Sequence, residues 1–141
     1  MTERAPLVGV LAASPSELSI LQQAGAILEK FGIPHEIRVM SASRHPDLVD
    51  EYARTAFERG LKVLICSTGV SGHLAAAVAA RTVLPVVGVP ISSPPEVSGG
   101  EALLITAQMP SGVPVATVGV DNAKNAAVLA ARILALSSPP S

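Results

Sequence analysis

Short runs of β-branched and other apolar residues alternate along the chain with longer segments in which apolar residues recur at helical spacing. This alternation is typical of a parallel sheet covered by helices. It predicts strands at 7–12, 35–40, 62–66, 86–90 and 115–118, and helices at 16–31, 46–59, 73–82, 101–107 and 122–136. We therefore expect one α/β domain over residues 1–141, a flavodoxin-like three-layer sandwich whose five-stranded parallel sheet has the order 2-1-3-4-5.

Residues that start or stop helices support these boundaries. Pro46 stands at the favoured first position of a helix, and Gly32 and Gly60 follow the ends of two others. Asp121 is expected to cap the last helix. The helix at 16–31 has one apolar face, formed by Ile20, Leu21, Ala24, Ile27, Leu28 and Phe31. The mixed polarity of 35–40 indicates an edge strand.

Ligands of such sheets bind outside the carboxyl ends of the strands, where the strand order reverses. This rule selects four loops, at 13–17, 41–45, 67–73 and 91–100. The last of them is rich in Pro and Gly and is expected to be mobile. Candidate chemistry is therefore sought in the first three loops.

The first loop offers an anion site. Ser14, Ser16 and Glu17 lie where a strand leads into a helix, so free amides and two hydroxyls can meet a phosphate. Glu17 also suits ribose hydroxyls. The alternative is that a serine here only caps the helix.

The second loop carries a cation and a titratable ring. Arg44 can clamp a phosphate or carboxylate through two parallel hydrogen bonds, and His45 can cap the next helix or titrate near neutral pH. A solvated arginine in an ordinary capping loop is the alternative.

The third loop contains two glycines, Gly69 and Gly72, which permit close approach of a ligand to the backbone. It lacks the spacing of a Walker loop or of a dinucleotide fingerprint. His73 is either a proton carrier or a hydrogen-bonded structural residue. Cys66, at the end of the preceding strand, is expected to be a buried apolar side chain.

Composition narrows the class of protein. Charged residues make up 15% of the chain, against roughly a quarter in an average soluble domain, so we expect helix faces to be buried in a homo-oligomer. A net charge of −1 and three aromatic residues argue against nucleic-acid binding. A single cysteine and three scattered histidines predict no disulfide and no metal site. No signal pattern or membrane-spanning run is visible, which favours a cytoplasmic protein.

Several motifs occur together in the order of one known family. They are the segments 8–17 and 41–46, the turn ending in His73-Leu74, Leu84-Pro85-Val86, Gly88-Val89-Pro90, Gln108-Met109-Pro110 and the run 112–118. With them the chain, from about Leu7 to Leu136, resembles the 5-(carboxyamino)imidazole ribonucleotide mutase / aminoimidazole ribonucleotide carboxylase (PurE) family. The resemblance implies a purine-biosynthesis enzyme that shifts a carboxyl group without a cofactor. In the mutase branch the group leaves the exocyclic nitrogen as carbon dioxide and is recaptured at a ring carbon, whereas the carboxylase branch adds free carbon dioxide.

The resemblance also implies roles for single residues. Ser14, Ser16 and Glu17 match a Gly-Ser-x-Ser-Asp segment that holds ribose and phosphate. Ser41 and Arg44 match the serine and the phosphate-binding arginine of a Ser-Ala-His-Arg motif. Gly69 and His73 fall near the imidazole ring, and Gln108 belongs to a segment that supports the site. Family members form octamers with active sites at subunit contacts, so the resemblance implies a homo-octamer.

Ser43 stands in the place of the family's proton-shuttling histidine. A hydroxyl does not exchange protons near pH 7, and loss of general acid–base help costs about 10²–10⁴ in rate. The implied mutase reaction therefore needs another proton carrier, for which His45 and His73 are the candidates. The chain differs from the family motifs at three further places. Glu17 replaces an Asp, Ala13 replaces a Gly, and the segment 68–72 replaces a Gly/Ala-rich turn. The alternatives are a non-catalytic ribonucleotide-binding paralog and a paralog recruited to a different (de)carboxylation.

Overall fold

The chain forms a five-stranded parallel sheet in the order β2-β1-β3-β4-β5, as expected for a flavodoxin-like α/β fold. The structure is a computed structural model, and it describes residues 5–69, 73–92 and 99–137. The strands are β1 (Val8–Ala12), β2 (His35–Val39), β3 (Val63–Thr68), β4 (Val86–Pro90) and β5 (Ala116–Thr117). β2 is an edge strand, as its mixed polarity predicts.

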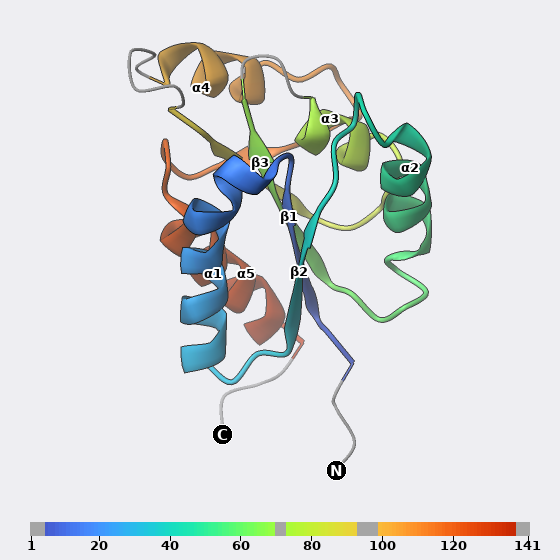
Figure 1. Cartoon of the computed structure of the whole chain (residues 1–141). Helices are drawn as coiled ribbons and strands as arrows, with labels where there is room; N and C mark the ends of the chain where they lie inside the picture. The colour runs from blue at the N-terminus through green and yellow to red at the C-terminus, as the bar shows by residue number, and fades with distance from the viewer. Residues whose placement is uncertain (1–4, 70–72, 93–98, 138–141) are drawn as a thin grey trace.

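Helices cover both faces of the sheet, so the predicted three-layer architecture is confirmed (Figure 1). The helices are α1 (Leu18–Lys30), α2 (Pro46–Thr55), α3 (Leu74–Ala79), α4 (Gly100–Ala107) and α5 (Ala123–Ala135), with a short 3₁₀ turn η1 (Pro15–Glu17) before α1. α1 and α5 pack together on one face, and α2 and α3 on the other. α4 lies across the carboxyl end of the sheet. Of the described helices, none is both long and apolar enough to cross a membrane.

The central strands β1 and β3 are buried along their whole length. Alternate side chains therefore belong to two separate apolar clusters. Val8, Val10 and Ile65 pack toward α1 and α5, while Leu11 and Cys66 pack toward α2 and α3. Cys66 is a fully buried apolar side chain, as predicted, and burial raises the pKa of its thiol.

Some predicted boundaries are wrong. α2 ends at Thr55 instead of Arg59, because tight turns over 56–60 close on Gly60, whose φ is +93°. Asn122 caps α5 through its side chain, whereas Asp121, with φ of 57°, turns its carboxylate to Ser92. Phe31 is 53% exposed and takes no part in the apolar face of α1. The remaining elements differ from the predicted ranges by a few residues at their ends. Most of the loop at 91–100 lies outside the described residues.

Gly9 in β1 lies directly under a tyrosine of α2. A Cβ at position 9 would come within 2.2 Å of the Tyr52 hydroxyl oxygen, a distance that real contacts do not reach. That hydroxyl is held in place because it donates to Glu36 at 2.6 Å. The glycine therefore allows α2 to pack against the sheet.

We expect Gly9→Ala to lower the free energy of unfolding by about 1–3 kcal/mol, because the added methyl group overpacks a fixed contact. Denaturant titration followed by circular dichroism measures this. The double variant Gly9→Ala/Tyr52→Phe, which lacks the oxygen nearest the new methyl, should lose less than the sum of its single changes. An unchanged midpoint in Gly9→Ala would show that α2 moves aside at no cost.

Glu36 on β2 forms the centre of a charged cluster. Its carboxylate accepts hydrogen bonds from Tyr52 at 2.6 Å, Arg59 at 2.7 Å and Arg38 at 3.2 Å. Burial alone raises the pKa of Glu36, but the hydrogen bonds from Arg59 and Tyr52 and the positive charges of Arg38 and Arg59 outweigh it. The pKa of Glu36 in the folded protein therefore lies below its ordinary value of 4.5.

A carboxyl group whose folded pKa is depressed contributes stability above its unfolded pKa and loses it as pH falls through the folded value. We expect the difference in Tm between the wild type and Glu36→Gln to favour the wild type at pH 6. The difference should shrink as pH falls below about 4.5. Thermal unfolding from pH 7 to pH 3 tests this. A difference that stays constant over the range would contradict a role for the Glu36 charge.

Candidate active site

The first and third loops are joined at the carboxyl ends of β1 and β3. The Ala13 N–H donates to Ser67 Oγ at 2.9 Å, and Ser67 Oγ donates to Glu17 Oε1 at 2.5 Å. Ser67 is completely buried, whereas Glu17 is half-buried. The predicted ribose-binding carboxylate thus faces the third loop.

Gly69 lies beside the second oxygen of this carboxylate. A Cβ built on Gly69 would be 3.5 Å from Glu17 Oε2, so the backbone of the third loop runs close to that atom. Glu17 and Gly69, both predicted site residues, are therefore brought together. Residues 70–72 of the third loop lie outside the described residues.

The serines of the first loop do not cap the helix through their side chains. Ser14 stands at the N-cap position of η1 with no side-chain cap, and its Oγ is 2.8 Å from Ser16 Oγ. The prediction of a simple capping serine is therefore wrong. The two hydroxyls remain together at the start of a helix, where an anion is favoured.

The second loop folds around Ser41. Ser41 Oγ accepts the Arg44 N–H at 3.2 Å and lies 3.1 Å from Ser43 Oγ, and the Ser41 carbonyl accepts the His45 N–H at 2.7 Å. Ser41 is buried, and Ser43, Arg44 and His45 are exposed. The buried serine thus holds a loop that presents three candidate residues to solvent.

Arg44 differs from the arginines of the neighbouring surface. Arg38 and Arg59 pair with Glu36, and Arg54 and Arg81 pair with Asp50. In the part of the chain that the structure describes, no carboxylate forms an ion pair with Arg44. Its guanidinium is therefore available to an anionic ligand.

His45 uses one ring nitrogen within its own loop. Its Nδ1 lies 3.3 Å from the Ser41 backbone N–H, which donates to it. His45 is the N-cap residue of α2, but its side chain forms no cap hydrogen bond. The predicted helix cap is therefore not formed, and the ring is tied to Ser41 instead.

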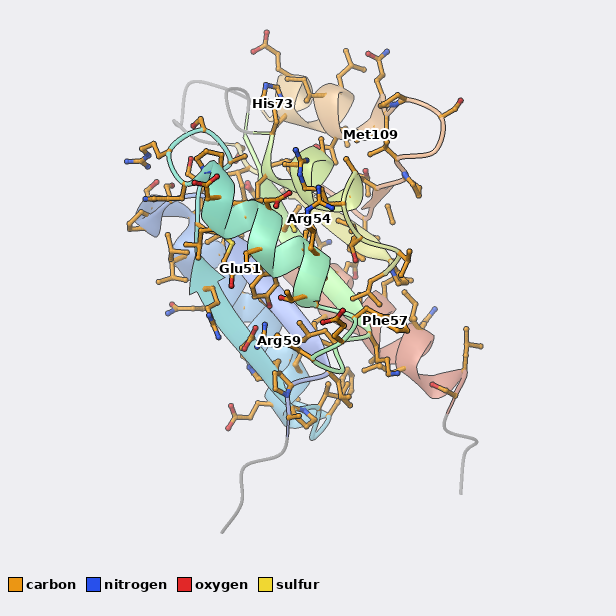
Figure 2. The ribbon with its side chains drawn as sticks, turned by 90° about the vertical axis from the view of Figure 1, so that its right-hand side faces the viewer. Glu51, Arg54, Phe57, Arg59, His73 and Met109 are labelled. Atoms are coloured by element: carbon orange, nitrogen blue, oxygen red, sulfur yellow. The ribbon has the colours of Figure 1, made fainter. Side chains whose placement is uncertain are left out.

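His73 and the segment after α4 share a small cavity. The cavity has a volume of about 20 Å³, room for about one water molecule, and is lined by Thr68, His73, Ala75, Ala76, Ile105, Thr106, Met109 and Val115. Figure 2 shows His73 and Met109 at the same end of the molecule. His73 is exposed, and its side chain makes no cap hydrogen bond to α3. The predicted Gln108 ends α4 next to Met109 and is exposed.

Sequence reasoning missed four polar residues at this edge, Ser67, Thr68, Thr106 and Asp121. Ser67 bridges two loops, Thr68 Oγ1 lies 2.5 Å from Thr106 Oγ1, and Asp121 accepts the Ser92 N–H at 3.0 Å and its hydroxyl. Ser67 and Thr68 end a strand that is otherwise apolar, and this change of polarity was the available signal. Asp121 and Thr106 gave no comparable signal.

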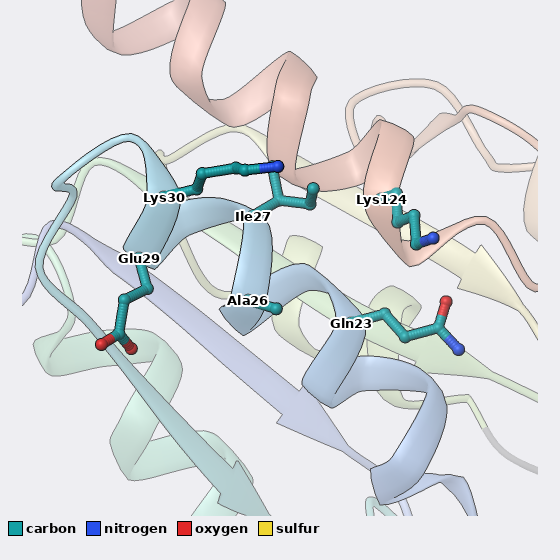
Figure 3. A pocket seen from close by; sticks show the side chains of 6 residues that line it. All are labelled: Gln23, Ala26, Ile27, Glu29, Lys30 and Lys124. Atoms are coloured by element: carbon teal, nitrogen blue, oxygen red, sulfur yellow. The ribbon is translucent and has the colours of Figure 1, made fainter.

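A larger open groove lies elsewhere, between α1 and α5 (Figure 3). It has a volume of about 490 Å³ and is lined by Gln23, Ala26, Ile27, Glu29, Lys30 and Lys124, all of which belong to helices. It contains none of the predicted site residues. Among the described residues, no three His, Cys, Asp or Glu side chains gather closely enough to hold a metal ion.

Comparison with known proteins finds a family that matches almost the whole chain. The family model described as AIR carboxylase matches residues 7–140. N5-carboxyaminoimidazole ribonucleotide mutase of Pyrococcus horikoshii is 50% identical over 139 residues, which are 99% of this chain and 78% of that protein. Phosphoribosylaminoimidazole carboxylase of Schizosaccharomyces pombe is 47% identical over 95% of this chain, but the match covers only 24% of that longer protein.

A solved structure leads to the same family. The crystal structure of Treponema denticola PurE superimposes with a TM-score of 0.80 at 30% sequence identity, covering 93% of this chain and 81% of that one. The family model matches almost all of the chain, and the fold of the chain is similar to that of the PurE structure. The chain belongs to the AIR carboxylase family of enzymes.

Proposed function

We propose that this protein transfers a carboxyl group on an aminoimidazole ribonucleotide, in the reaction of purine biosynthesis that gives its relatives their names. The observation that carries the proposal is the 50% identity to a carboxyaminoimidazole ribonucleotide mutase over 99% of the chain. The substrate would lie across the first three loops at the carboxyl end of the sheet, with carbon dioxide as the group that moves.

Three features of the site suit the phosphate and the ribose of a ribonucleotide. Arg44 carries a charge without an ion-pair partner among the described carboxylates, and its planar group can bind phosphate through two hydrogen bonds. Ser14 and Ser16 offer hydroxyls at the start of a helix. Glu17 Oε2 is an acceptor for ribose hydroxyls, and Gly69 leaves room beside it.

The reaction needs a group that moves a proton. When the bond between the exocyclic nitrogen and the carboxyl carbon breaks, carbon dioxide leaves and the nitrogen gains a proton. When the ring carbon bonds to carbon dioxide, that carbon loses a proton. Ser43 cannot exchange these protons near neutral pH.

His73 is the better of the two histidine candidates. A neutral His45 whose Nδ1 accepts the Ser41 N–H carries its hydrogen on Nε2, so neither ring nitrogen accepts a further proton without loss of that bond. The His73 side chain makes no such cap bond and lines the cavity beside Met109. We therefore assign proton transfer to His73 and the shaping of the second loop to Ser41, Ser43 and His45.

The test of this function is turnover of carboxyaminoimidazole ribonucleotide by the purified protein. The ultraviolet absorbance of the product measures the rate. We expect slow but measurable turnover in the wild type. His73→Asn should lower it about 10²–10⁴-fold while ribonucleotide affinity, measured by calorimetry, stays unchanged. Tight binding without turnover would instead identify a non-catalytic ribonucleotide-binding protein. Turnover of His73→Asn at the wild-type rate would remove His73 from the mechanism.

We also propose that the protein works as a homo-oligomer, with an octamer as the expected size. Large apolar side chains stand exposed on the described surface, among them Leu104 on α4 at 60%, Val83 at 85% and Phe57 at 61%. Contact between subunits would remove such side chains from water. Light scattering coupled to size exclusion measures the mass; a monomer at micromolar concentration would contradict the proposal.

A further inference from the structure

Ser67 is a buried hydroxyl between two loops of the site. It is fully inaccessible to solvent at the end of β3, and its Oγ has two hydrogen-bond partners, the Ala13 N–H at 2.9 Å and Glu17 Oε1 at 2.5 Å. Among the residues that the structure describes, Glu17 alone receives the Ser67 hydroxyl hydrogen. This arrangement connects the first loop to the third through one side chain.

The direction of these hydrogen bonds is fixed by chemistry. A backbone N–H can only donate, so Ala13 uses a lone pair of Ser67 Oγ and the single hydroxyl hydrogen points to Glu17. A carboxylate oxygen can only accept, which completes the chain of donors. Ser67 is therefore a fixed donor to Glu17 Oε1.

Fixing one carboxylate oxygen orients the other. Glu17 Oε2 is directed toward Gly69, 3.5 Å from where a Cβ on that residue would lie. A glutamate side chain has three rotatable bonds and loses much conformational entropy when a ligand orders it. If the protein orders the side chain before the ligand binds, the free energy of binding does not include that loss of entropy.

We propose that Ser67 is a positioning residue that holds Glu17 so that Oε2 accepts hydrogen bonds from sugar hydroxyls of the ligand. The proposal rests on the proposed function, because it takes the ligand to be a ribonucleotide. It explains how Glu17, one methylene longer than the aspartate of the family segment, presents a rigid acceptor. The preference for ribose over a deoxyribose then depends on Ser67, a residue that does not touch the ligand.

The test compares aminoimidazole ribonucleotide with its 2′-deoxy and 3′-deoxy analogues by calorimetry. We expect the wild type to prefer the ribonucleotide over at least one analogue by about 10- to 100-fold, since hydrogen bonds to charged groups are among the stronger ones. Ser67→Ala should reduce that preference about tenfold and leave the affinity for the discriminated analogue unchanged. In a Glu17→Ala background, Ser67→Ala should have no further effect on the preference.

Controls separate positioning from folding. Thr55→Val, which removes a hydroxyl that donates to the Glu51 carbonyl at 2.8 Å on α2, should leave all affinities at wild-type values. If Ser67→Ala does not fold, Ser67→Cys, which keeps a weak donor, should show an intermediate preference.

The outcomes distinguish this proposal from the proposed function. If the wild type binds no ribonucleotide, the proposed function fails. If the wild type binds and discriminates, but Ser67→Ala lowers affinity for ribonucleotide and analogue alike, or acts equally in the Glu17→Ala background, then Ser67 has only a structural role and the present proposal is overturned.

Discussion

Ser43→His is expected to raise the rate of carboxyl transfer about 10²–10⁴-fold, the contribution of a well-placed general acid–base group. Ser43 occupies the position of the histidine in the Ser-Ala-His-Arg motif that the family resemblance implies. Its side chain is exposed, and the loop is held from Ser41, so an imidazole at position 43 meets no buried neighbour. The variant should add a second proton carrier, beside His73, to the binding residues proposed above.

The pH dependence gives this prediction a second readout. An imidazole titrates near pH 6.5, so turnover by Ser43→His should change between pH 5.5 and 7.5 in a way that follows its protonation. Ser43→Asn, which has a similar size and does not titrate, is the matched control and should keep the wild-type rate. If the histidine variant were no faster than the asparagine variant, position 43 would not face the reacting atoms.

Arg44→Ala is expected to weaken ribonucleotide binding about 10- to 150-fold, the value of a hydrogen-bonded charge contact. The loss should come from the phosphate, because Arg44 has no ion-pair partner among the described carboxylates. The affinity of Arg44→Lys for the ribonucleotide should lie between those of the wild type and Arg44→Ala. An ammonium group keeps the charge but cannot form the two parallel hydrogen bonds. Calorimetry with the nucleotide measures the change.

Two controls locate the effect at the phosphate. The nucleoside without its phosphate should bind the wild type and Arg44→Ala equally. Arg54→Ala, which removes an arginine already paired with Asp50 at 2.9 Å, should leave nucleotide affinity intact. If Arg44→Ala weakened nucleoside and nucleotide to the same degree, Arg44 would shape the second loop and not bind phosphate.

The sheet could be predicted because its signals are local. The apolar runs of β1, β3 and β4 mark buried parallel strands, and helical spacing between them sets the strand order through general rules of connection. Because ligands of such sheets bind outside the carboxyl ends of the strands, the predicted strand ends then indicated the loops that lie at one edge of the sheet in the structure. Glu17 and Gly69, far apart in sequence, meet there as expected.

The hydrogen-bond partners could not be predicted, because they depend on geometry across the sheet. Ser67 looked like one polar residue at a strand end, yet it joins Ala13 and Glu17. Asp121 looked like a helix cap, but Asn122 forms that cap and Asp121 binds Ser92 across two strand ends. Such choices depend on a register and a loop path that a single sequence does not encode in any local pattern.

The most direct test of carboxyl transfer follows an isotope label on the carboxyl group that moves. Purified protein is incubated with aminoimidazole ribonucleotide that carries a ¹³C-labelled carboxyl on its exocyclic nitrogen, and ¹³C NMR follows the label. We predict that the label reaches the ring carbon in the presence of the wild type, and faster still with Ser43→His. If the label is lost to bicarbonate at the rate seen without protein, and the ring carbon stays unlabelled although the ribonucleotide is bound, the protein binds its ligand without performing the transfer.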